Sequence, residues 1–465
     1  MIIKRQVNYR TNRSAVRFAS YNPVKRVFQR DMIELTLRAT LVLVIASLFF
    51  EGIFPILSSV RTQLLCLALV AAALHCLQNE GRVLISFSSV LWLVFLGYCV
   101  FNQGSALVDG SDAIWLRSVA LIVALSFLLA FEWEKWISVV MKASACFGIV
   151  CAAATIIFFL MPQVYEVWFK PTFYSESVNA VGYMSGLASH YSLNGMYLVW
   201  GLLATWTLLL ASNNEKKARY FVASVVVFIA LLLTTKRAHL LFGICCCVAL
   251  YLLLHSGDLS KRLLYVIFGL FILIVLFFLA SMLVPELARV VTRFEGLVGD
   301  DSFGGRSSYY EICLGLYHDR PLSGFGWNAF TETLYSSGIL DLRRLYAAGN
   351  LNQNAHNVFL QLLAEEGIVG LTLFLSASFA VLVKSILVLR KLIKKTPECE
   401  SEMPVLFSIG IQCFFLLYCF TGNPLYEPVE YFVFFLSTLP IAFHSFKYEK
   451  QVNASPAYKA FSRRG

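Results

Sequence analysis

The residues in this sequence that could carry chemistry are a histidine at the start of a long apolar run and a set of arginines ahead of it. His356 and Asn357 open the stretch AHNVFLQLLAEEGIVG, and an apolar run begins at Gly367 and continues to Leu389. An imidazole ionises near neutral pH, so it can act as a general base toward a hydroxyl group. His356 is therefore the candidate catalytic residue, although a lone histidine beside apolar residues is often only a packed core residue.

The arginines lie in one segment, from Pro285 to Ala355, which contains no lysine. A planar guanidinium can hold two phosphate oxygens through parallel hydrogen bonds, which an ammonium group cannot do. The segment therefore predicts an anion site, with the alternative that arginine merely tolerates half-buried positions at a membrane surface better than lysine. Its six arginines are Arg289, Arg293, Arg306, Arg320, Arg343 and Arg344, of which Arg289, Arg306 and Arg320 are candidates for binding substrate.

A second pair of charges interrupts an apolar region in the stretch LLLTTKRAHLLFG. Lys236 and Arg237 lie between two hydrophobic runs with almost no loop around them. Charges at such a position are costly and indicate a function by default. The alternative is that both side chains reach out of a tight turn to lipid headgroups. His239, which follows, is interpreted as structural.

The elements that must position these residues are membrane helices. The chain has 465 residues, of which 58% are hydrophobic and only 14% charged, and its mean hydropathy is +0.70. Apolar runs of about 17–25 residues, each long enough to cross a hydrocarbon core of roughly 30 Å, recur along it. The sequence predicts an all-α polytopic membrane protein with about twelve spans, at 33–53, 56–77, 83–101, 114–131, 137–160, 181–211, 220–235, 238–254, 263–284, 367–389, 404–421 and 430–446. The overlong sixth span is expected to be bent or partly re-entrant.

Lysine and arginine predict the orientation of these spans, because they accumulate on the cytoplasmic side. The tail before the first span, the even-numbered connections and the last segment together hold 24 of them, whereas the short connections on the other side hold four. Both termini are therefore expected in the cytoplasm, and the 285–355 segment on the extracytoplasmic face. The net charge of +10 is mostly this topological signal and does not indicate a nucleic-acid partner.

The chain is expected to divide at the ends of its one long connection. A basic cytoplasmic tail (1–32) precedes spans one to nine (33–284), and the large extracytoplasmic loop (285–355) follows. The His-motif helix and spans ten to twelve (356–446) and a cytoplasmic tail (447–465) complete it. A long connection in an otherwise compact bundle is more often functional than accidental.

Three helices are expected in the long loop. They begin in PELARVVTRFEGLVG, GGRSSYYEICLGLYHDR and WNAFTETLYSSG, and the turn-rich PLSGFGWN lies between the last two. A further helix over 356–366 would place His356 at the edge of its apolar face and Glu366 in the middle of it. These two residues would then be roughly 15 Å apart, so any carboxylate partner of His356 must come from another element. No carboxylate cluster has metal-ligand spacing and no cytoplasmic connection has a nucleotide fingerprint, so no metal and no cofactor are predicted.

These features together resemble the superfamily of O-antigen ligases and Wzy-type polysaccharide polymerases of bacterial envelopes. That superfamily carries a His followed by Asn, Ser or Gln, nine residues, Gly, two residues, and Gly, Thr or Tyr. His356, Asn357, Gly367 and Gly370 fit this pattern. GGRSSYYE resembles the Gly-Arg element of the family, DRPLSGFGWNAF its Pro-Leu-x-Gly-x-Gly segment, and TTKRAHLL a Ser/Thr-rich stretch that ends in Arg. The similarity covers about 180 to 390.

The resemblance implies a membrane glycosyltransferase with a GT-C-type bundle in the bacterial inner membrane. Such an enzyme moves a glycan from undecaprenyl diphosphate to an acceptor hydroxyl, without a metal and with inversion at the anomeric carbon. Arg237 and Arg306 would bind the diphosphate, and His356 would act at the acceptor hydroxyl. Lys236, Arg289, Arg320 and Asn357 are further substrate-binding candidates.

The implied partners are the lipid-linked donor, an acceptor glycan, membrane lipids and a chain-length regulator. A repeat-unit polymerase, as in O-antigen, capsule or exopolysaccharide synthesis, is preferred to a ligase that transfers the glycan to lipid A-core, because polymerases are the more common case; the motif does not separate the two. The alternative from another class is a carrier or flippase, which would need charges near mid-membrane and internal repeats.

Overall fold

The computed structural model describes residues 23–79, 86–103, 111–172, 179–180, 183–212, 214–254, 258–283, 302–336, 354–395 and 403–444. This part of the chain is almost entirely helical, as predicted. Helices are expected here because a bilayer core offers backbone groups no water, so each N–H and C=O must find its partner within the segment.

The long helices follow the expected spans. They are α1 (Pro23–Phe49), α3 (Arg61–Gln78), α4 (Phe87–Gln103), α5 (Ser111–Leu129), α6 (Trp133–Leu160), α8 (Tyr191–Leu210), α9 (Asn214–Leu233), α10 (Arg237–Leu254), α11 (Leu259–Leu283), α16 (Val358–Lys395), α17 (Met403–Tyr418) and α18 (Pro428–Phe443). Shorter elements are α2 (Pro55–Ser59), α7 (Pro162–Val164), α13 (Ser302–Asp319), α14 (Ala329–Ser336) and single turns at Ala130–Glu132, Tyr165–Phe169 and Lys170–Thr172.

Within the residues that the structure describes, six stretches are both long and apolar enough to cross a membrane. They are Asp31–Phe49, Arg61–Gln78, Trp115–Leu160, Tyr191–Leu210, Arg237–Leu254 and Val358–Ile393, and α4, α17 and α18 provide three shorter apolar helices. The chain is therefore a multi-pass membrane protein.

The sixth expected span begins later than its apolar run suggested. Residues 183–190 are not helical: β2 (Tyr183–Met184) pairs antiparallel with β1 (Asn179–Ala180). Asn194 on α8 holds this segment, because its Nδ2 donates to the Met184 carbonyl (2.9 Å) and to Thr155 Oγ1 (3.0 Å). The apolar residues before Tyr191 therefore fold back on the bundle, and α8 starts at Tyr191.

The core of the bundle lies around α17 and α18, which are buried along almost their whole length. Beside them α8 packs against α6, α9 and α10, while α4 packs on α16 and α5 packs on α3 and α18. Helices in a membrane associate through close van der Waals packing, which small residues permit. At the crossing of α6 and α8, for example, a Cβ at Gly148 would clash with the Cα of Gly201.

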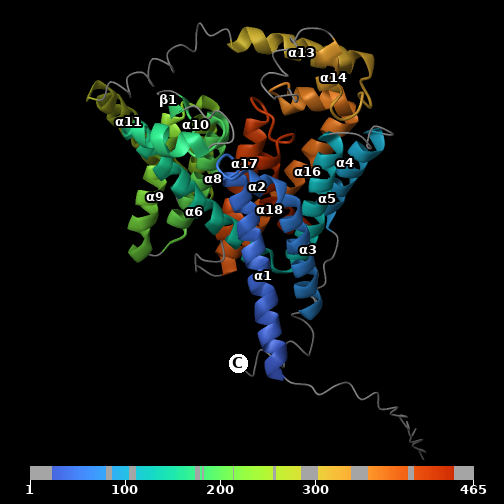
Figure 1. Ribbon diagram of the computed structural model, residues 1–465, viewed down its shortest axis with the longest axis horizontal. Helices are drawn as coiled ribbons and strands as arrows, with labels where there is room; N and C mark the ends of the chain where they lie inside the picture. Colours follow the sequence, from blue (N-terminus) through green and yellow to red (C-terminus); the bar gives the residue numbers. More distant parts are fainter. Residues whose placement is uncertain are drawn as a thin grey trace, which may run out of the picture.

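Two short helices of the long loop cover one end of this bundle. We call α13 and α14 the cap; they lie over α16, and α1 extends from the opposite end (Figure 1). Both cap helices coincide with segments expected to be helical. The first expected helix of the loop lies outside the described residues, as do Arg289, Arg293, Arg343 and Arg344.

Candidate functional site

His356 precedes the long helix that follows the cap. Its φ is +56°, a left-handed conformation that few non-glycine residues adopt, and α16 starts only at Val358. Asn357 begins the helix, because its Oδ1 accepts a hydrogen bond from the Leu360 amide (3.1 Å). The prediction of a helix that includes His356 was therefore wrong: the Asn357 cap starts the helix after His356 and leaves the imidazole on a loop.

The imidazole of His356 is half-buried and contacts an asparagine from the connection between α17 and α18. Asn423 Nδ2 lies 3.3 Å from His356 Nδ1, and the amide oxygen of Asn423 has no partner among the described residues. Rotation of this amide by 180° would let its oxygen accept from Nδ1–H instead, which leaves Nε2 as the proton acceptor. No carboxylate of the described residues contacts the ring; an amide takes that place.

Two cations act on this imidazole. Burial, followed by the positive charges of Arg306 on α13 and Lys236 between α9 and α10, lowers the pKa of His356 to about 4. Since all three effects disfavour the imidazolium, the ring is neutral at neutral pH and can accept a proton. The structure thus brings three of the predicted site residues together: His356, Arg306 and Lys236.

A tight turn places Lys236 at the cap end of the bundle. Thr235 has a φ of +54°, and Thr234 Oγ1 accepts from the Lys236 amide (3.3 Å). The ammonium group lies 4.3 Å from the centre of the Tyr191 ring, at the start of α8. Gly195, one turn into α8, leaves room for this turn, since a Cβ there would touch Cβ and Cγ of Lys236.

The other predicted cations are placed differently. Arg237 is the first residue of α10 and follows Lys236 directly. Arg320 is exposed just after α13, with its guanidinium carbon 4.5 Å from the centre of the Phe325 ring. The positive charge of Arg306 thus acts on His356, whereas Arg320 faces the loop after the cap helix.

Glu365 and Glu366, the two glutamates of the stretch that begins at His356, hold the loop after α13 to the bundle. Glu365 accepts from the Tyr426 hydroxyl (2.8 Å), from Gln361 Nε2 (3.1 Å) and from the Phe330 amide (3.4 Å). Glu366 accepts from Asn102 Nδ2 on α4 (3.0 Å). Both carboxylates are fully buried. Their role at this position is to tie α4, α14 and the connection before α18 to the start of α16.

The glycines of the motif allow two backbones to touch. Helix α16 is kinked at Gly367, whose φ is +63°. A Cβ at Gly367 would clash with the Leu322 carbonyl, and one at Gly324 with the Glu365 carbonyl. At this contact the Gly326 amide donates to Glu365 (2.7 Å) and the Ile368 amide donates to Pro321 (2.9 Å). The Pro-Leu-x-Gly-x-Gly segment and the His motif are therefore two halves of one docking contact, which positions the cap over His356.

Sequence reasoning missed Asn423, whose side chain contacts His356 from the connection before α18. Besides Asn423, Asn354 donates to Glu427 (3.3 Å), and burial raises the pKa of that carboxyl. His190 caps α8 by accepting from the Ser192 amide (3.1 Å), and burial followed by the charge of Lys236 lowers its pKa to about 4. The available signal was the polar stretch TGNPLYEPVE in a short connection between two apolar runs.

Comparison with known proteins finds a family match for the part of the chain that contains Lys236, Arg306 and His356. Residues 222–375 match the family Wzy_C, described as O-antigen ligase, and this region extends from α9 into α16. No curated protein matches the chain. This match covers about a third of the chain and confirms its resemblance to the superfamily of O-antigen ligases and Wzy-type polymerases.

Proposed function

We propose that this protein is an inverting membrane glycosyltransferase of the GT-C type. It transfers a glycan from undecaprenyl diphosphate to an acceptor sugar hydroxyl, and it acts as a Wzy-type repeat-unit polymerase. The observation that carries this proposal is the imidazole of His356, held on a loop beside Asn423 (3.3 Å) where the charges of Arg306 and Lys236 act on it. A diphosphate leaving group needs fixed positive charge where its own negative charge grows, and the attacking hydroxyl needs a base beside it.

In the proposed reaction His356 removes the hydroxyl proton of the acceptor through Nε2. The acceptor oxygen forms a bond to the anomeric carbon from the face opposite the diphosphate. The bond between that carbon and the phosphate oxygen breaks, and its electron pair leaves with the diphosphate, so the anomeric configuration inverts. Asn423 supports this role if its amide oxygen accepts from Nδ1–H, because that hydrogen bond fixes the tautomer in which Nε2 is free.

The cations have a double effect in this scheme. Before the donor binds, Arg306 and Lys236 lower the pKa of His356, so the empty site does not hold a proton on the ring. A bound diphosphate offsets their charge, and the imidazole then becomes a stronger base at the moment when the acceptor hydroxyl must lose its proton. Lys236, whose role the sequence alone left open, is thereby assigned to the donor site along with Arg306 and the neighbouring Arg237.

The proposed placement has twelve crossings, both termini in the cytoplasm and the cap on the extracytoplasmic face. The uneven distribution of lysine and arginine supports it. The site lies at the cap end of the bundle, so a lipid-linked donor would present its diphosphate there at headgroup depth. A ligase is the second candidate, because the matched family is described as O-antigen ligase.

Transfer by the purified, reconstituted protein tests this function. With one lipid-linked repeat unit as the only glycan, a polymerase lengthens the chain on its lipid, whereas a ligase forms product only after a separate acceptor is added. His356→Gln keeps a hydrogen-bonding group but cannot accept the proton, so we expect transfer to fall by about 10²–10⁴-fold while undecaprenyl diphosphate still binds. Normal transfer by this variant would overturn the mechanism.

A further inference from the structure

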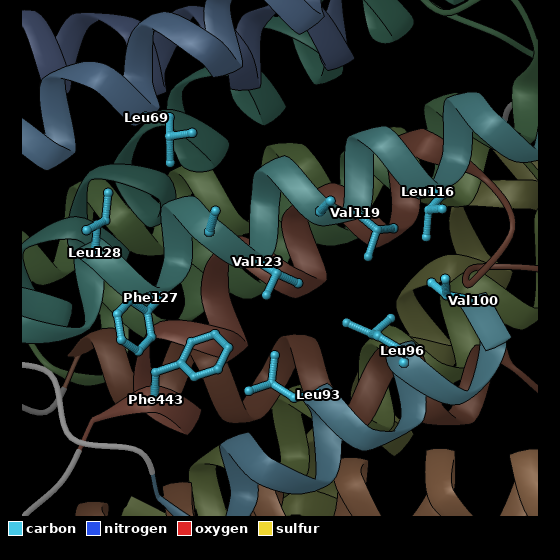
Figure 2. A pocket seen from close by; sticks show the side chains of 13 residues that line it. Leu69, Leu93, Leu96, Val100, Leu116, Val119, Val123, Phe127, Leu128 and Phe443 are labelled. Atoms are coloured by element: carbon cyan, nitrogen blue, oxygen red, sulfur yellow. The ribbon is translucent and has the colours of Figure 1, made fainter.

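A long apolar groove opens between α4 and α5, away from the candidate catalytic residues. Its walls come from those two helices, and Leu69 of α3 and Phe443 of α18 lie toward the end that is marked by Phe127 and Leu128 (Figure 2). The groove has a volume of about 630 Å³, and every side chain that lines it is aliphatic or phenylalanine. That volume lies within the roughly 300–1,000 Å³ typical of small-molecule sites, but the usual polar groups are absent from this lining.

The shape of the groove suits a chain better than a compact ligand. On α5 its lining extends from Leu116 to Leu128, a distance of about 18 Å along a helix axis. This is more than half of a hydrocarbon core of roughly 30 Å. A slender hydrocarbon that lies along the membrane normal would therefore fill it.

A glycine keeps the middle of the groove open. Gly97 lies inside α4 among the lining residues, and a Cβ at this position would meet nothing within 4 Å. Glycine inside a helix costs about 0.5–1 kcal/mol relative to alanine, and no close helix contact at Gly97 offsets that cost. The space beside Gly97 is thus available to a ligand and not needed for packing.

One end of the groove reaches the segments that form the candidate site. Val100 of the lining is two residues from Asn102, whose side chain donates to the Ser323 carbonyl (2.6 Å) and to Glu366. At the same end Trp115 stacks on Trp327 (4.0 Å between ring centres) and donates to the Leu425 carbonyl (3.0 Å). Leu425 is two residues from Asn423, the partner of His356, so a lipid in the groove would have its headgroup end at the level of the site.

We propose that the groove between α4 and α5 binds the polyisoprenoid tail of the lipid-linked donor. This inference rests on the proposed function, because it takes the occupant from the donor that the site would use. The apolar lining excludes a charged or sugar-containing occupant, and continuity with the loop at Ser323 and Trp327 distinguishes the tail of a substrate from an arbitrary membrane lipid.

The test fills the groove from Gly97. Gly97→Leu adds an apolar side chain in open space, so the variant should fold and insert normally. Gly269→Leu on α11 is the matched control, since a Cβ there also meets nothing within 4 Å and the position is exposed. Each variant would be assayed with the same glycan on undecaprenyl diphosphate and on farnesyl diphosphate, whose tail is too short to occupy the whole groove.

We expect Gly97→Leu to lower kcat/KM for the undecaprenyl donor by about tenfold, which is one decade of affinity, and to change the farnesyl donor little. Gly269→Leu should change neither. Equal losses with both donors would mean that the substitution acts on the site or the fold, and no loss with either donor would mean that the tail lies elsewhere. Both outcomes overturn the proposal.

A binding measurement separates this proposal from the proposed function. Undecaprenyl diphosphate with a photoreactive group in its tail should label α4 or α5 of the normal protein, and Gly97→Leu should abolish the label. If α4 or α5 is labelled but the protein transfers no glycan, the proposed function is rejected, whereas the proposal that the groove binds the lipid tail is supported. Competition by an equal amount of ordinary phospholipid would show that the groove holds bulk lipid, and would overturn the proposal.

Discussion

Removing the charge of Lys236 should change the pH at which His356 loses its function as a base. The pKa of His356 is lowered from 6.5 to about 4, first by burial, then by Arg306 and third by Lys236. Each effect favours the neutral ring, so removal of a cation must raise the pKa. The third-largest of three effects in one direction contributes at most a third of the total, so Lys236→Gln should raise the pKa by at most about 0.8.

The assay is the pH dependence of transfer by the reconstituted enzyme with saturating acceptor. kcat/KM reports the ionisation of the free enzyme and kcat that of the donor complex. In the normal enzyme the acid limb of kcat/KM should lie near the pKa of about 4 and below that of kcat, because the bound diphosphate offsets Arg306 and Lys236. In Lys236→Gln the acid limb of kcat/KM should move to higher pH, within the limit above.

Lys170→Gln is the matched control, because Lys170 pairs with Glu166 on an exposed turn (2.6 Å). It removes the same charge and should leave both limbs in place. If Lys236→Gln left the acid limb unmoved, or shifted it downward, then Lys236 would not act on the titrating group. If the acid limbs of kcat and kcat/KM gave the same pKa, the bound donor would not raise the pKa of His356, and this part of the reasoning would be refuted.

Three further predictions concern Arg306, Asn423 and the docking contact at Gly367. Arg306→Lys should lower kcat nearly as much as Arg306→Ala, by about 10²-fold, because lysine keeps the charge but loses the fork; full activity would reduce the role of Arg306 to simple charge attraction. Asn423→Asp should raise the pKa of His356 by placing a carboxylate beside Nδ1, and an acid limb of kcat/KM at unchanged pH would contradict this pairing. Gly367→Ala should lower the free energy of unfolding by about 1–3 kcal/mol, because its φ is +63° and its Cβ would clash with Leu322; Gly269→Ala is the control in thermal unfolding.

Hydropathy was sufficient to predict the helical bundle. In lipid the backbone N–H and C=O groups of an apolar segment must pair with one another, so the segment forms a helix whatever its neighbours are. The two described helices of the cap also followed from the sequence. The run before α8 shows the limit of this reasoning. Its residues are apolar enough to continue the span, but Asn194 satisfies the backbone of a hairpin there, and hydropathy does not record where a single amide finds its partner.

The site was predictable by residue type and not by geometry. His356 and Arg306 stood out because their side chains suit the chemistry, and Asn357 carried a signal for a helix start that the apolar period of 356–366 obscured. Asn423 could not be found in this way, since it lies 67 residues from His356 in the sequence and its contact depends on how α17 returns to the cap end. Glu365 and Glu366 interrupted the apolar pattern for a structural reason, namely the docking of the cap.

The apolar groove marks a different limit, because its sequence signal is indistinguishable from that of a lipid-facing surface. Leucine, valine and alanine on α5 satisfy the hydropathy pattern equally well whether they face bulk lipid, another helix or a bound hydrocarbon. Gly97 differs only in being a glycine without a close neighbour, which no pattern in one sequence reveals. In the sequence of a membrane protein, charged residues interrupt the apolar background and thus indicate the part of a site where the reaction takes place. The hydrophobic end has to be found from the shape of the helices, and here that shape leads from Leu128 to the loop beside His356.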